Sequence, residues 1–296
     1  TIMLYLLSAS LIWSFSFGLI KNNLADLHPN LISFIRIALS FIVFLPFIKT
    51  RNIEIKLKLK LILTGAIQFG LMYITYIYSY RFLKGYEVAL FTIFTPLYVS
   101  VIHDLMRKKL HRNYFIISIL VISGTAIIVY KGISSTAFLP GFILLQFSNI
   151  FFAWGQVHYR EIMKVRKDIR DRDIFAYLYF GAMIVTLTSL LTTVDLSSIY
   201  ISGKEALTLL YLGTIPSGIA FFLWNFGVRR SGIGTISILN NLKIPLAIII
   251  SMTVFGEQGD LVRIFTGCSI LISALIYNEI SERKKRISVS SGTSGE

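Results

Sequence analysis

The sequence is poor in the residues that enzymes use for chemistry. Of its 296 residues only 15% are charged, four are histidine and one, Cys268, is cysteine. A single cysteine excludes an internal disulfide and a cysteine-based metal site. The chain also lacks a His-Glu-x-x-His pattern, a pair of aspartates within an apolar run and a clear glycine-rich phosphate loop. We therefore expect no enzymatic activity, no cofactor and no metal.

Apolar residues take the place of the missing charges. They make up 55% of the chain, and the mean hydropathy is +0.71, which is too apolar for a soluble fold of this length. A helix of about 20 apolar residues spans a hydrocarbon layer of about 30 Å. We predict an all-α polytopic membrane protein with ten transmembrane helices, at about 2–20, 30–48, 61–80, 88–106, 114–130, 140–159, 174–194, 206–228, 235–255 and 261–280.

Lysine and arginine predict the orientation, because positive residues stay on the cytoplasmic side. Most of the 29 lie in the connections near 49–60, 107–112 and 160–172 and in the tail after 282, whereas we assign Arg229 and Arg230 to the opposite side. This predicts a multi-pass protein of a prokaryotic inner membrane with both termini in the cytoplasm. The net charge of +14 then reflects topology, and we expect no nucleic-acid partner.

Two segments of the chain repeat the same pattern. An offset of 149 residues aligns Tyr80–Ile102 with Arg229–Ser251 and pairs Pro96 with Pro245. Five helices per copy is an odd number, so the second copy must enter the membrane from the opposite side. Inverted repeats of this kind are typical of secondary transporters, whose site lies near the midplane between the repeats. We predict repeats at 1–135 and 136–282, followed by a flexible basic Ser/Gly tail at 283–296.

Several stretches resemble a known family. They are "IWSFSFG" in the first span, "FIRIALSF" in the second, "YRFLKGYEVALFTIFTPLYVSVI" at the fourth and "VRRSGIGTISILNNLKIPLAIIISMTVFGEQ" at the ninth. In these the sequence resembles the EamA-like transporters of the drug/metabolite transporter (DMT) superfamily. The resemblance implies inverted five-helix repeats (5+5) and alternating access around a central cavity lined by helices one, three, four, six, eight and nine. The sequence departs from the family pattern at "HDLMRKKL", where a Gly-Glu pair is common. It also departs at Lys243, because a central lysine is not part of the general pattern.

Lys243 is a charge in the middle of an apolar run. It lies about eight residues, or roughly 12 Å, from the nearer end of the ninth span, which is too far for its side chain to reach the interface easily. A charge at that depth is a functional-site hypothesis by default. We expect it to attract an anionic substrate group. The alternatives are pairing with carbonyls opened by Pro245 or with a neighbouring side chain, and titration during coupling.

Other polar and aromatic residues share faces with helical spacing inside the spans. On the third, sixth and ninth helices such faces would meet protein or water rather than lipid. For Asn149 and Gln156 the alternative is hydrogen bonding between helices, and for each tryptophan it is packing or anchoring at the membrane interface. Besides Lys243, the predicted substrate-binding residues are Asn240, Asn241, Tyr73, Tyr76, Gln68, Gln146, Asn149, Trp154, Trp224, Asn225 and Trp13, and the predicted structural or hinge residues are Pro96, Pro245 and Arg36.

The sequence thus predicts a secondary transporter for a small metabolite with an anionic group, such as an amino acid, a carboxylate or a carboxylated vitamin. Export of neutral or cationic amphipathic solutes is the alternative, as is a ligand-binding membrane receptor without transport. The acidic residues Glu87, Asp104, Glu257 and Glu279 lie at span ends, which argues against the usual intramembrane proton site. We expect a small-molecule substrate and membrane lipid as the partners. The sequence does not decide the oligomeric state, and a monomer is one possibility.

Overall fold

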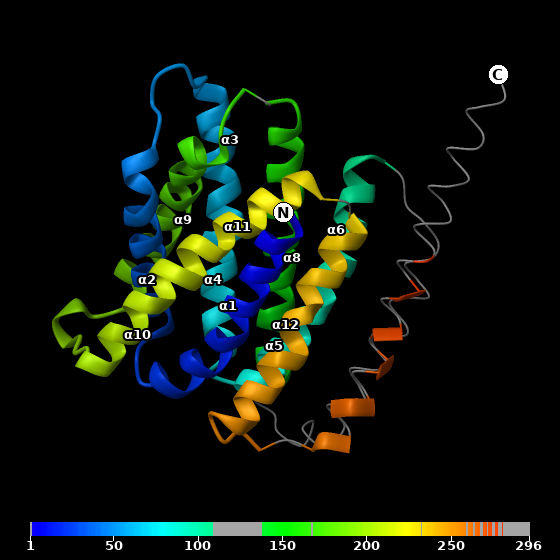
Figure 1. Ribbon diagram of the computed structural model, residues 1–296. Helices are drawn as coiled ribbons and strands as arrows, with labels where there is room; N and C mark the ends of the chain where they lie inside the picture. Colours follow the sequence, from blue (N-terminus) through cyan, green and yellow to red (C-terminus); the bar gives the residue numbers. More distant parts are fainter. Residues whose placement is uncertain are drawn as a thin grey trace.

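The computed structural model describes residues 2–108, 138–166, 168–231, 233–258 and much of 260–280. Every regular element in this part of the chain is helical, which confirms the all-α prediction (Figure 1). The elements of the first part are α1 (Ile2–Asn23), α2 (Pro29–Phe44), η1 (Leu45–Phe47), α3 (Ile55–Gly65), η2 (Ala66–Leu71), α4 (Met72–Ser79), α5 (Gly85–Phe91), η3 (Thr92–Phe94) and α6 (Thr95–Met106). Those of the second are α8 (Phe138–Lys164), α9 (Asp171–Thr193), η5 (Leu196–Ser198), α10 (Gly203–Thr214), η6 (Ile215–Ile219), α11 (Ala220–Arg230) and α12 (Ile233–Thr253).

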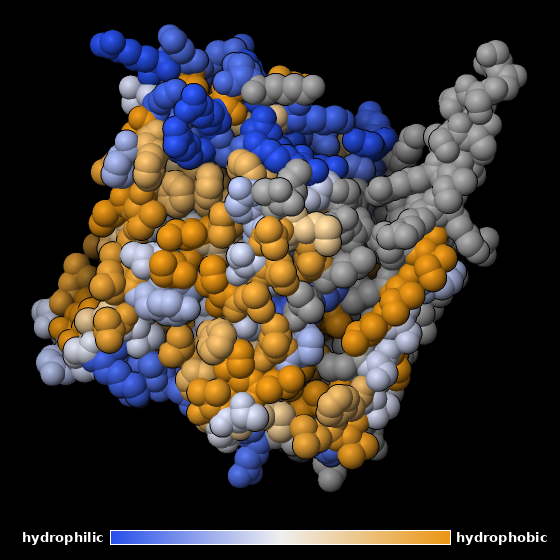
Figure 2. All heavy atoms as spheres, viewed as in Figure 1, coloured by the Kyte–Doolittle hydropathy of each residue, from blue (hydrophilic) through white to orange (hydrophobic). Residues whose placement is uncertain are grey.

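The molecule is a polytopic membrane protein. Seven helices among the described residues are long and apolar enough to span a bilayer, and the shorter Leu239–Thr253 matches the predicted ninth span. Large apolar side chains point outward, such as Leu207 at 69% exposure, and Figure 2 shows a hydrophobic belt below a hydrophilic end. The predicted fifth span, part of the tenth span and the tail at 283–296 lie outside the described residues, so the count of ten helices stays a prediction.

The connection between α2 and α3 and that between α8 and α9 meet at one end of the bundle. Lys49 Nζ lies 2.9 Å from Asp173 Oδ2, and Arg166 forms two hydrogen bonds of 3.0 Å with the Glu54 carboxylate. The start of α1 lies at this end too, because the Tyr5 ring is 5.0 Å from that of Phe226 in the last turns of α11. We call this the N-terminal end of the bundle.

The structure corrects the side that we assigned to Arg229 and Arg230. Both arginines bind the same oxygen of Asp171, at 2.9 and 3.0 Å, so they lie at the N-terminal end together with the other basic connections. The reason is that α9 and the helix formed by α10, η6 and α11 cross the bundle once each, which returns the chain to the end that it left. The correction strengthens the charge bias on which the predicted orientation depends.

Two of the membrane helices contain a π-helical segment. One is η2, between α3 and α4, and the other is η6, between α10 and α11. Their first residues, Ala66 and Ile215, are 149 residues apart, which is the offset that aligns the two repeats in the sequence. Such segments are rare and occur often at functional sites.

The two aligned prolines have different effects. The helix before Pro96 is interrupted by the 3-10 segment η3, whereas α12 continues through Pro245. Pro96 is buried and Pro245 is exposed. A proline removes one backbone hydrogen bond in either position; only at Pro96 does the resulting break lie beside a cavity.

Candidate functional site

A cavity with about 550 Å³ of empty space, part of it open to solvent, lies among the helices. It is lined from seven of the membrane helices, and every lining side chain except Tyr76 is buried. The lining residues are Trp13, Ser16, Phe17, Arg36, Met72, Tyr73, Tyr76, Thr92, Thr95, Ser148, Asn149, Phe152, Phe221 and Lys243. This set contains two cations and no carboxylate.

Lys243 reaches the cavity from α12. Its side chain is 5% exposed, its Nζ donates a hydrogen bond of 3.1 Å to Asn240 Oδ1, and Nζ lies 5.0 Å from the centre of the Trp13 ring. A cation over an indole face is stabilised by the quadrupole of the ring. Among the described residues no carboxylate forms an ion pair with Lys243, so the protein orients this charge without neutralising it.

Arg36 reaches the cavity from α2 and is only 2% exposed. Its Nε donates to Ser217 Oγ at 3.0 Å and its Nη2 donates to the Tyr73 hydroxyl at 3.1 Å. The Tyr73 hydroxyl donates in turn to Ser217 Oγ at 2.7 Å. One edge of the guanidinium is thereby fixed, while Nη1 has no hydrogen-bond partner among the described residues.

The π-helical segment η6 explains why these groups can meet. Pro216 has no N–H to donate to the Leu212 carbonyl, and the Ser217 hydroxyl binds that carbonyl at 2.6 Å instead. The Ala220 N–H bonds five residues back to Ile215, which leaves the Pro216 carbonyl to accept a bond of 3.0 Å from Trp13 Nε1. The irregular backbone therefore anchors a cavity wall.

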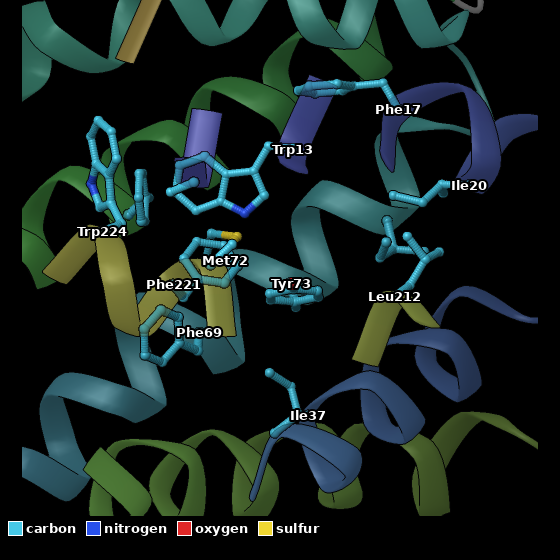
Figure 3. Packing of buried hydrophobic residues seen from close by; sticks show 14 of the residues in the cluster. Trp13, Phe17, Ile20, Ile37, Phe69, Met72, Tyr73, Leu212, Phe221 and Trp224 are labelled. Carbon is cyan, nitrogen blue, oxygen red and sulfur yellow. The ribbon is translucent and has the colours of Figure 1, made fainter. Parts of the chain in front are cut away.

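Aromatic rings form most of the apolar wall. The Trp13 ring is 4.8 Å from Phe221 and 6.1 Å from Phe152, and Tyr73 is 5.9 Å from Phe221. Figure 3 shows Trp13, Phe221 and Tyr73, which come from different helices, gathered around one region. The cavity is thus an aromatic chamber with positive groups on its wall, and it suits an apolar solute that carries an acceptor.

Asn149 lies where α8 meets the break before Pro96. Its Nδ2 donates to the Phe91 carbonyl at 2.9 Å, and its Oδ1 accepts from Thr95 Oγ1 at 3.2 Å. Gln146, one turn away, accepts from Tyr98 at 3.1 Å. Asn149 lines the cavity and also joins two helices, so both of its predicted roles remain compatible with its position.

Of the residues that we predicted to bind substrate, Lys243, Tyr73, Tyr76, Asn149 and Trp13 line the cavity, and Asn240 positions Lys243. Six lie outside the lining and contact other side chains. Gln68 and Asn225 bond each other at 3.0 and 3.4 Å, Trp224 donates to Gln156, Trp154 stacks on His158, Gln146 accepts from Tyr98, and Asn241 accepts weakly from Asn240. A role for these six in binding stays a prediction.

Sequence reasoning passed over several lining residues. Arg36 carried the same signal as Lys243, a charge inside an apolar run, but we assigned it a structural role. Thr92, Thr95, Ser16 and Ser148 gave no separate signal, because small hydroxyl residues are common in membrane helices and bond to their own backbone. In the described residues no group of three metal-binding side chains converges.

Different contacts join the helices at the two ends of the bundle. At the N-terminal end the buried Asp171 accepts from Tyr159, Arg229 and Arg230. There, too, the hydrogen bonds and charge of Arg166 lower the pKa of the exposed Glu54. At the opposite end the Glu257 carboxylate accepts from the backbone N–H groups of Gly85 and Tyr86, each at 2.9 Å, and so ties the end of α12 to the start of α5.

The sequence is similar to those of known membrane transporters over most of its length. The profile of the EamA-like transporter family matches residues 1–130 and 138–278. A "Probable biotin transporter" of Pseudomonas aeruginosa is 32% identical over 96% of this chain and all of its own length. "Biotin transporter" proteins of Salmonella typhimurium and Escherichia coli are 32% and 31% identical, over 92% of this chain and 91% of their own.

One solved structure, titled only "Crystal structure of protein", superposes with a TM-score of 0.69 and covers 93% of this chain and 96% of its own. Its sequence identity is 15%, so the likeness concerns the fold alone.

Proposed function

The chain belongs to the EamA-like transporter family, and on that basis we propose that it carries a small carboxylate across the membrane, with biotin as the first candidate. The family makes the protein a membrane transporter rather than an enzyme. The relatives named as biotin transporters support the narrower substrate, because biotin is a carboxylated vitamin. The site would be the aromatic cavity that contains Lys243.

The unneutralised charge of Lys243 is the observation that carries the proposal. An ammonium group in a buried, largely apolar cavity is costly to keep without an anion. Asn240 and the Trp13 face orient this charge but leave its net value unchanged. A substrate carboxylate would supply the missing partner, and the aromatic wall would bury the apolar part of the solute. Because both cations that line the cavity, Lys243 and Arg36, would repel a positive charge, an organic cation is a poor substrate for it.

Alternating access is the mechanism that we propose for the movement. The Asp171 contacts at one end and the Glu257 contacts at the other are polar and local, and they could open separately without unfolding a core. The matching offset of η2 and η6 supports two inverted halves that rock around the cavity. We propose that the N-terminal end faces the cytoplasm of a bacterial cell, because the basic connections gather there.

Transport into proteoliposomes tests the proposal. Purified protein should take up labelled biotin at a rate above that of empty liposomes, and unlabelled biotin should raise the melting temperature of the protein, because a ligand stabilises the state that it binds. Biotin amide, which has no carboxylate, is the matched control and should do neither. Uptake of both compounds alike would contradict the role of the carboxylate, and binding without flux would favour a receptor.

A further inference from the structure

We infer that Arg36 is a second recognition group in the cavity and binds an uncharged or anionic acceptor at the end of the solute that lies away from its carboxylate. This rests on the proposed function, because it assumes that Lys243 binds the carboxylate. It assigns to the transporter a narrower substrate class: an amphipathic carboxylate with an apolar middle and a carbonyl-type acceptor at its far end.

The hydrogen bonds of Arg36 carry the inference. Ser217 and the Tyr73 hydroxyl bind Nε and Nη2, so the plane of the guanidinium is fixed. Nη1 is buried and has no partner among the described residues, and Arg36 lines the cavity. A buried donor without an acceptor costs free energy and is uncommon in native proteins. An acceptor on the bound solute would satisfy it.

A purely structural arginine would be arranged differently. A buried cation that only joins helices is normally paired with a carboxylate, as Arg229 is with Asp171. Arg36 has no such partner among the residues that the structure describes, and its two bonds go to neutral hydroxyl groups. The protein orients the charge of a residue that lines the cavity and leaves Nη1 without a partner among the described residues.

Arg36 and Lys243 come from different sides of the bundle. α2 contacts η6, η6 contacts α1 and α1 contacts α12, and Figure 1 shows α1 between α2 and α12. The rings of Trp13, Tyr73 and Phe221 lie among these helices. Within the cavity Arg36 lies by the Tyr73 ring and Lys243 by the Trp13 ring, so a solute bound to both cations would offer an acceptor to each and place its apolar part against the aromatic rings.

Two ligands separate this inference from general attraction of anions. Biotin carries a carboxylate, a chain of methylene groups and a cyclic urea with a carbonyl oxygen. 5-Cyclopentylpentanoate keeps the carboxylate, the chain and a five-membered ring but lacks the far acceptor. Affinities of both would be measured by calorimetry on the purified wild type and on Arg36→Gln, Lys243→Met and Arg81→Gln; Arg81 donates to Leu27 at the end of the bundle, outside the cavity lining.

We expect the wild type to bind biotin at least about 10-fold more tightly than 5-cyclopentylpentanoate, because one buried hydrogen bond to a charged group is worth about that factor. Arg36→Gln should weaken biotin about 10-fold and 5-cyclopentylpentanoate less than about 2-fold. Lys243→Met should weaken both alike, and Arg81→Gln neither. Arg36→Lys should restore little of the selectivity, because an ammonium lacks the planar donor edge.

Equal weakening of both ligands by Arg36→Gln, or no weakening, would overturn the inference while leaving the carboxylate site intact. If the variants of Arg36 do not fold, the wild type still decides the question, since a ratio of affinities below about 2 would overturn it. A wild type that binds neither carboxylate would refute the proposed function itself, and the inference with it.

Discussion

At the scale of single residues, Lys243 is where the sequence and the structure agree most closely. A charge in the ninth apolar run predicted a cavity-facing group, and the structure gives it one polar partner, Asn240, and one aromatic face, Trp13. Neither neutralises it. Substitution of Lys243 should therefore lower the affinity for substrate and leave folding intact, whereas substitution of a purely structural lysine would damage folding and leave the affinity unchanged.

Replacing Lys243 by methionine should lower the affinity for an anionic substrate by roughly 30-fold or more, because loss of a buried charge pair costs about 2–5 kcal/mol. The melting temperature should change little or rise, because the substitution deletes a buried charge that nothing in the protein pairs with. Binding by calorimetry and thermal unfolding would be measured on the same preparation. Damaged folding with unchanged affinity would contradict the prediction.

Asn240→Ala is the companion variant, because it leaves the charge and removes only the bond that orients it. It should weaken anion binding by about 3–10-fold, in line with one hydrogen bond worth about 1 kcal/mol. Lys243→Arg should be a poor rescue, since the guanidinium is larger and places its donors differently. An Asn240→Ala effect as large as that of Lys243→Met would mean that the asparagine itself binds the solute.

At the scale of elements, the crossing of α3 and α9 depends on two glycines. A Cβ on Gly65 would lie 1.8 Å from the Leu178 carbonyl oxygen, and a Cβ on Gly181 would lie 1.9 Å from the Ile62 carbonyl oxygen. Small residues allow membrane helices to approach this closely. The crossing fixes α3, and with it η2 and α4, which carries Tyr73 and Tyr76 into the cavity.

Gly65→Val should therefore separate α3 from α9 and destabilise the protein by about 3 kcal/mol or more, because overpacked interiors rarely relax fully. The loss would be seen as a lower melting temperature in detergent and as reduced biotin binding. Gly203→Ala is the control, since nothing lies within 4 Å of a Cβ built there. Equal effects of the two substitutions would contradict the role of the close crossing.

At the scale of the whole molecule, orientation is testable by labelling. In a Cys268→Ser background, Thr50→Cys and Tyr200→Cys introduce exposed thiols at opposite ends of the bundle. In intact cells an impermeant maleimide should label Tyr200→Cys and not Thr50→Cys, and both should react in opened membranes. The reverse pattern would invert the orientation that the basic residues predict.

The closure at the Glu257 end supplies a test of alternating access. Glu257→Gln keeps the shape of the side chain but offers the two amides of α5 one oxygen in place of two. It should raise the rate at which an impermeant reagent labels Ser16→Cys in the cavity, several-fold, from the outer side. Glu205→Gln, which disturbs only a local cap of α10, is the matched control. An unchanged rate would mean that Glu257 does not hold this end closed.

The sequence alone determined that the protein lies in a membrane, that it is all-helical and that Lys243 lies inside an apolar run. Long apolar segments and an isolated charge within one can be recognised from the order of residues. Helical periodicity also identified polar faces, but it does not say whether such a face contacts another helix or lines a cavity. Gln68 and Asn225 bond each other across two helices, whereas Asn149 lines the cavity and also bonds to Phe91 and Thr95.

Only the tertiary structure decided that Arg36 lines the same chamber as Lys243, and that Arg229 and Arg230 return to the end where Asp171 lies. Both facts depend on contacts between segments more than 50 residues apart. The tertiary structure also decided how the irregular backbone of η6 is satisfied. A proline predicts a missing backbone hydrogen bond but not which side chain replaces it. Here the Ser217 hydroxyl donates to the Leu212 carbonyl, and Trp13 donates to the freed Pro216 carbonyl.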